Sequence, residues 1–242
     1  MGQFDNVAGK LVASVRDMVP GRFVIEPTTP ATHPHVQWEA YTRVREIAAG
    51  LGLRHLGDVD ITSIRHDLSM MRRPVLAIYT NRDGTEVIGH YRLALRWTPM
   101  GILARLLGGR GDMFDVGTNF GGGDGVTLET TSAAAAGVWN QPEWNLREML
   151  PKGTPLPQML ERHRGWVRDY RAQHPEAQPT AIRTLQDIVA ISDRMEQRKL
   201  EWRRQLGWAT RDELARISKM TGPQLNELYA AFRKAADRTT FG

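Results

Sequence analysis

The sequence predicts an α+β protein, in which an antiparallel sheet at about 53–132 is followed by a helical C-terminal part. Residues 86–97 alternate between two sets of side chains with a period of two, which is typical of a strand with one buried face. From residue 157 onward, apolar residues recur at spacings of three and four, which is typical of helices. Strands that come before helices, without alternating with them, favour this fold class.

These patterns divide the chain into three regions. We expect an N-terminal helical arm and linker, an antiparallel sheet domain and a helical C-terminal region, at residues 1–52, 53–150 and 151–242. The arm contains a helix over 7–19, which Pro20 and Gly21 end, and a second helix over 36–49. The first of these helices is expected to pack on the sheet domain or on another chain.

Within the sheet domain the clearest signal is a hairpin of two strands, 74–80 and 86–97. The Asp83-Gly84 pair suits the tight connection between them, because Gly accepts positive φ and Asp tolerates it. Further strands are expected over 53–64, 112–116 and 126–132, the first with a bulge or bend at Gly57 and the second at an edge of the sheet. Residues 142–157 are expected to be irregular, since prolines punctuate them.

Composition limits the classes of function. The 242 residues include no cysteine, which removes disulfides, thiolate nucleophiles and Cys-ligated zinc, and fits a cytoplasmic location. No run of eighteen apolar residues is present, so we expect no transmembrane segment. The formal net charge of +5 permits contact with phosphates or anionic lipid but does not require it.

A long helix over about 179–206 motivates the main functional hypothesis. Its apolar stripe must be buried by something, and the stripe includes Ile182, Leu185, Val189 and Met195. We expect a non-catalytic protein whose helical tail mediates interaction with another protein or with a second copy of the chain. No cofactor is expected.

A second hypothesis concerns the last two helices, which begin with the capping-box patterns Thr210–Glu213 and Thr221–Gln224. Residues 214–228 resemble a helix-turn-helix, with Lys219 where that family usually has the turn glycine. The resemblance implies a DNA-binding regulator. Its DNA-contacting residues would be Thr221, Gln224, Asn226, Arg233 and Lys234.

A third hypothesis is a metal-dependent hydrolase or nuclease at the glycine-rich run 117–125. Asp124 and Glu129 would hold the metal through oxygen ligands, and His90 would complete the set or serve as a general base. The run lacks the Lys-Ser/Thr pair of a phosphate-binding loop and is followed by a strand, so a flexible hairpin loop is the plainer interpretation. No catalytic constellation emerges from the sequence.

Two further segments allow a structural or a functional interpretation. The apolar stretch from Trp97 to Leu107, with arginines at both ends, is typical of a short helix that covers a sheet edge or touches a membrane surface. His163 lies on the apolar face of its helix, between Leu160 and Trp166, and is expected to be a core residue with one satisfied ring nitrogen.

Overall fold

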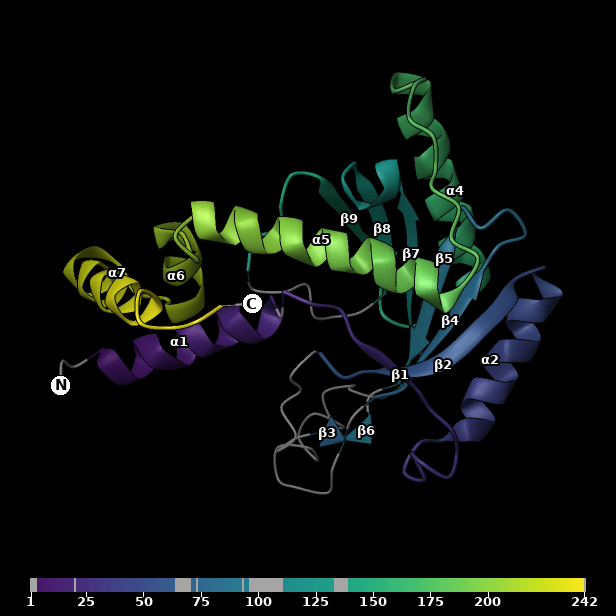
Figure 1. Ribbon diagram of the computed structural model, residues 1–242, viewed down its shortest axis with the longest axis horizontal. Coiled ribbons are helices and arrows are strands. Elements are labelled where there is room, and N and C mark those ends of the chain that lie inside the picture. The colour runs from purple at the N-terminus through teal and green to yellow at the C-terminus, as the bar shows by residue number, and fades with distance from the viewer. Residues whose placement is uncertain are drawn as a thin grey trace.

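The computed structural model describes residues 4–19, 21–63, 71–72, 74–92, 94–95, 111–132 and 139–241. The predicted interfacial stretch from Trp97 to Leu107 lies outside these residues. Figure 1 shows a sheet at one end of the molecule, a group of helices at the other, and one long helix that joins them.

The α+β prediction is confirmed by a seven-stranded, mostly antiparallel sheet with the strand order β1-β2-β4-β5-β7-β8-β9. Its strands are Ile25–Pro27, Arg54–Ile61, Leu76–Thr80, Val87–Tyr91, Met113–Asn119, Thr127–Thr131 and Asn145–Met149, in that order. The predicted hairpin is present as β4 and β5, but β5 ends at Tyr91 instead of continuing to residue 97. The bulge predicted near Gly57 is present as a register shift between His55 and Gly57. A separate pair, β3 (Met71–Arg72) and β6 (Ala94–Leu95), forms a second, two-stranded sheet.

Two expectations about the strands were wrong. β7 is an interior strand between β5 and β8, and not an edge, because Phe114, Val116 and Thr118 are buried on one of its faces. β9 forms where irregular chain was expected, and it pairs with β8 in parallel. This edge strand carries charged side chains at Arg147 and Glu148, so the alternation that marks a strand in sequence is weak.

Helices cover both faces of the sheet. α2 (Trp38–Gly50) and α4 (Leu156–Gln173) pack on one face, in a cluster that includes Tyr41, Ile88 and Leu160. The first half of α5 (Leu185–Gln205) packs on the opposite face. Figure 1 shows α5 crossing the sheet and continuing beyond it to the remaining helices. Among the described residues, no helix is both long and apolar enough to cross a membrane.

The far end of α5 meets a helical unit built by α1 (Asp5–Met18), α6 (Arg211–Ser218) and α7 (Gly222–Ala236). α1 lies against α7, so the expectation that it packs on the sheet or on another chain was wrong. The reason is its apolar stripe, which joins the core of the C-terminal helices. That core includes Val12, Val15, Leu214, Leu228 and Phe232.

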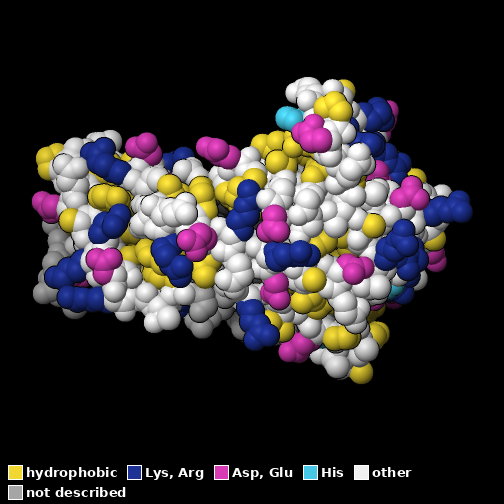
Figure 2. Space-filling model, turned by 45° about the horizontal axis from the view of Figure 1, so that its top comes forward, with side chains coloured by type: hydrophobic (Ala, Val, Ile, Leu, Met, Phe, Trp, Pro, Cys, Tyr) yellow, Lys and Arg dark blue, Asp and Glu magenta, His cyan; other side chains and the backbone are white. Residues whose placement is uncertain are grey.

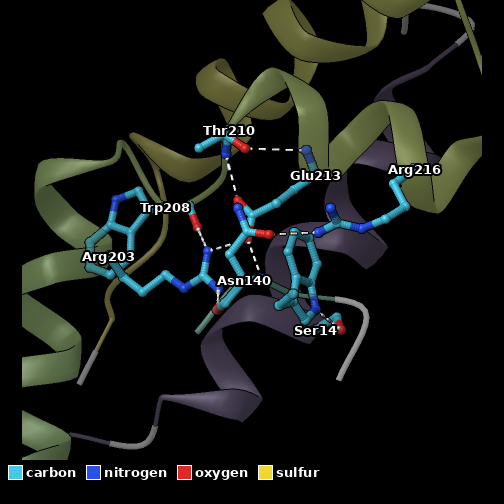
Figure 3. A network of polar contacts seen from close by, with 8 residues as sticks. Ser14, Asn140, Arg203, Trp208, Thr210, Glu213 and Arg216 are labelled. Carbon is cyan, nitrogen blue, oxygen red and sulfur yellow. Dashed lines mark hydrogen bonds and ion pairs between the residues drawn. The ribbon is translucent and has the colours of Figure 1, made fainter. Parts of the chain in front are cut away.

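A buried ion pair fixes the corner between α5 and α6 (Figure 3). The side chains of Arg203 and Glu213 are both fully buried, and Arg203 Nη1 lies 2.7 Å from Glu213 Oε1. Arg203 Nη2 also donates to the backbone oxygen of Asn140 at 2.6 Å, and the Asn140 N–H donates to Glu213 Oε1 at 2.7 Å. Glu213 Oε2 accepts from the Thr210 N–H, which completes the predicted capping box of α6.

The environment of Glu213 keeps it ionised. Burial by itself would raise the pKa of this carboxyl, but hydrogen bonds from Thr210, Arg203 and Asn140 outweigh it and hold the pKa below its usual value. The second capping box, Thr221–Gln224, does not form, because the Thr221 side chain makes no cap hydrogen bond. Gly222, the first residue of α7, has a φ of 59°, which turns the first N–H groups of the helix away from an ordinary capping geometry.

Replacing Gly123 by Ala should reduce the free energy of unfolding by about 3 kcal/mol. Gly123 has a φ of +101°, and an added Cβ would lie 3.1 Å from the Ile191 backbone oxygen and from Arg194 Cβ. Gly153→Ala is the matched control, because its φ of +84° is also left-handed but no atom lies within 4 Å. The control should lose only about 1 kcal/mol in urea unfolding. Equal losses in the two variants would contradict the tight approach of α5 to this loop.

Candidate functional site

The apolar stripe of α5 is occupied within the chain. The helix begins at Leu185 and not near 179 as predicted, so Ile182 lies in the segment before it. Ile182 is buried, and Leu185 and Met195 pack in the same cluster, which also contains Val59 and Ile78 of the sheet. Val189 is half-buried. The expectation that this stripe presents an apolar surface to a second molecule is therefore corrected: the side chains that needed a partner find it in the sheet of the same chain.

The three residues predicted to bind a metal do not converge. His90 is fully buried on the sheet face that α2 covers, where its ring stacks on Phe114 and its Nε2 lies 2.9 Å from Asp112 Oδ1. Glu129 points to the opposite face, because it alternates with Thr130, whose hydroxyl contacts α4. Asp124 is an exposed residue at the end of the glycine-rich turn η1 (Gly121–Gly123). Among the described residues, no three His, Asp or Glu side chains form a metal site.

The glycine-rich run serves to hold the sheet against neighbouring segments. The N–H of Gly122 donates to Thr180 Oγ1 at 2.8 Å, and the N–H of Gly123 donates to Asn119 Oδ1 at 2.9 Å. Arg198 Nη1, from α5, donates to the carbonyl oxygens of Asp124 and Gly125 at 2.6 and 2.7 Å. These N–H groups are engaged within the chain and so do not form a cradle for phosphate.

His163 is a core residue, and both of its ring nitrogens have partners. Nε2 lies 2.9 Å from Thr118 Oγ1 and Nδ1 lies 3.0 Å from Thr130 Oγ1. Since a neutral imidazole offers one donor and one acceptor, two hydroxyl groups that can each donate or accept satisfy it. Burial lowers the pKa of His163 to about 4.

A pair of carboxylates on the α5 face was not singled out from the sequence. Asp115 of β7 lies opposite Thr131 of β8, which donates to Asp115 Oδ1, and Glu129 lies two residues before Thr131. Arg147 of β9 donates from Nε and Nη2 to Glu129 Oε2 at 2.9 and 2.7 Å. Burial, with the nearby charge of Glu129, raises the pKa of Asp115 to about 6, and burial also raises the pKa of Tyr91.

Asp115 thus resists ionisation beside a second carboxyl group, and a carboxyl with a raised pKa is one part of an acid–base pair. Only the register between β7 and β8 brings them together, because they are distant in sequence. The sequence could have identified this pair of carboxyl groups only if the pairing of β7 with β8 had been known in advance.

A short turn at 219–221 joins α6 and α7, at the place where the helix-turn-helix was predicted. α6 has eight residues, and Lys219 follows it in the left-handed conformation, with φ 57° and ψ 20°. A lysine therefore makes the turn for which helix-turn-helix proteins usually have a glycine, at a cost of about 1 kcal/mol. Leu214 from α6, with Leu225 and Leu228 from α7, anchors both helices in the core of the helical unit.

The exposed side of α7 is polar. Thr221, Gln224, Asn226, Arg233 and Lys234, the residues predicted to contact DNA, are all exposed. Over residues 211–238, the exposed charged residues are six Lys or Arg and three Asp or Glu. In Figure 2, Lys and Arg side chains are spread over the helical end of the molecule, with fewer acidic side chains between them.

The contribution of His163 to the free energy of unfolding should fall as the pH is lowered from 6.5 to 4, while Asp115 acts in the opposite direction. An unfolded His takes up a proton near pH 6.5, but His163 in the fold does so only at about 4, so the unfolded state binds more protons within this window. The loss due to His163 should reach about 3 kcal/mol at pH 4. Urea unfolding of the wild type and of His163→Gln at both pH values isolates the contribution of His163, since Gln does not titrate. A constant difference between the two proteins would contradict the assignment.

Replacing Asp115 by Asn should stabilise the protein by about 1–3 kcal/mol at pH 7. The raised pKa means that the folded state binds more protons than the unfolded state between pH 4 and 6, so ionised Asp115 opposes folding above that window. The gain should disappear below pH 4, where the carboxyl is protonated in both states. Asp124→Asn, at an exposed carboxylate, is the control and should change little. Destabilisation by Asp115→Asn at pH 7 would show that the carboxylate is held by favourable contacts.

No protein-family model, no curated protein and no solved structure matches this chain.

Proposed function

We propose that this protein binds duplex DNA through α6 and α7. The observation that carries the proposal is the left-handed Lys219, which joins the two helices by a short, sharp turn. A turn of this kind sets the second helix across the first and leaves its N-terminal half free to enter the major groove. The core of the helical unit holds the opposite face of α7, through Leu225, Leu228 and Phe232.

The charge of the helical unit supports the same proposal. The exposed cations of residues 211–238 outnumber the exposed acids by six to three. The carboxylate of Glu213 is buried and forms an ion pair with Arg203, so it does not add negative charge to the surface. A duplex attracts such a surface because each phosphate that meets a Lys or Arg releases counterions. In this proposal Arg233 and Lys234, near the C-terminal end of α7, contact the phosphate backbone, and Gln224 and Asn226 lie closer to the start of the helix.

The other two hypotheses have less support. The interaction role was inferred from the α5 stripe, whose residues are packed on the sheet. The hydrolase hypothesis required His90 and Glu129 on one face, and they lie on two. A cytoplasmic location belongs to the proposal, because a chain without cysteine has no need of an oxidising compartment.

The wild type should bind a mixed-sequence duplex at low salt, with an affinity that falls steeply as the salt concentration rises. The double variant Arg233→Ala/Lys234→Ala should bind more weakly, and the slope of log affinity against log salt should become shallower by about 2, one for each phosphate contact. Fluorescence anisotropy at four salt concentrations measures both quantities.

The matched control removes the same charge from the sheet end of the molecule. Arg168 and Arg171 are exposed on α4, so Arg168→Ala/Arg171→Ala changes the net charge equally but leaves α7 intact. This control should keep the wild-type slope. An absence of binding at 50 mM salt, or an equal effect of the two double variants, would refute the proposed interface.

A further inference from the structure

An arginine and an asparagine form a hydrogen-bonded unit on the proposed DNA-binding surface. Arg211 is the first residue of α6, and Asn226 lies in the second turn of α7. Both side chains are exposed, and Arg211 donates from Nε and Nη2 to Asn226 Oδ1 at 3.2 and 3.0 Å. The two helices of the motif are therefore linked by side chains at the place where α7 would enter the groove.

This pairing fixes which way the Asn226 amide faces. A guanidinium group has donors only, so the atom it contacts at both nitrogens must be the amide oxygen and cannot be the amide nitrogen. The oxygen of Asn226 is consequently turned toward Arg211, and the NH2 group is left for another partner. What the unit offers to a ligand is the remaining N–H groups of Arg211 together with the NH2 group of Asn226.

A surface with donors alone suits one base edge better than the others. Asn alone reads adenine, because its oxygen accepts from N6 while its nitrogen donates to N7. That pairing is blocked when Arg211 occupies the amide oxygen. The major-groove edge of guanine instead presents two acceptors, N7 and O6, side by side.

On this basis, and resting on the proposed function, we propose that Arg211 and Asn226 act as one specificity-determining unit that selects guanine. Arg211 has a second role in the unit, since it suppresses the adenine preference that Asn226 would have on its own. In this unit Asn226 holds Arg211 in place for guanine, and Arg211 occupies the oxygen that Asn226 would need for adenine.

Selection from a pool of random duplexes tests this inference. The wild type should enrich one position about tenfold for guanine over adenine. Asn226→Ala should lose most of that preference. Arg211→Ala should reverse it toward adenine, because the amide oxygen becomes free to accept from N6. Arg238→Ala, which removes an exposed cation just beyond α7, is the matched control and should keep the guanine preference.

The outcomes separate the inference from the function on which it rests. Adenine enrichment by the wild type, retention of duplexes without any base preference, or an unchanged guanine preference in Arg211→Ala would overturn the inference but leave DNA binding intact. Failure of the wild type to retain any duplex at low salt would overturn the proposed function and the inference with it. Circular dichroism of each variant confirms that the helices are intact before selection.

Discussion

The ion pair between Arg203 and Glu213 is the interaction on which the arrangement of this molecule depends. Taking two charges out of water is costly, and their mutual attraction offsets that cost only when further hydrogen bonds satisfy the remaining groups. Here the Asn140 backbone bonds to both partners, and Thr210 donates to the second carboxylate oxygen. The pair therefore stabilises one particular corner between α5 and α6, since either charge left alone in that place would be strongly unfavourable.

That corner connects two cores that are otherwise separate. One end of α5 packs on the sheet through Ile188 and Ile191, and its other end contributes Leu200 to the core of the helical unit. Trp139 enters the same helical core directly before Asn140, and its ring nitrogen donates to the Ser14 hydroxyl of α1 at 3.3 Å. Because α5 is shared, the corner fixes where α6 begins, and α7 is held in turn by α6 and by its packing on α1.

The sequence predicted those features whose signals are local. The period of two in β5 and the Asp83-Gly84 turn identified the hairpin, and the Thr210–Glu213 pattern identified the start of α6. Lys219 adopts the left-handed conformation although its side chain disfavours it, because the packing of Leu214 and Leu225 on either side of the turn fixes the two helices. Two short helices joined by a turn at Lys219 were therefore within reach of sequence reasoning, while their role in DNA binding stays a prediction.

What the sequence could not predict depends on which segments meet in space. The stripe on α5 was correctly identified as apolar, but its partner, the sheet face around Val59 and Ile78, could not be inferred from spacing. The same holds for Asp115 and Glu129, which the register of β7 and β8 brings together, and for Arg211 and Asn226, which meet only after α6 and α7 have packed. In each case the residue types were visible, and the missing information was the pairing.

A double-mutant cycle on Arg203 and Glu213 tests the central interaction most directly. Arg203→Met and Glu213→Gln should each reduce the free energy of unfolding by about 3–5 kcal/mol, because each leaves a buried polar group or charge without its partner. The double variant should lose less than the sum of the two single losses by at least about 2 kcal/mol, which is the coupling expected of groups in contact. Losses that add to within about 0.5 kcal/mol would show that the two residues act independently and that the corner is held by other contacts.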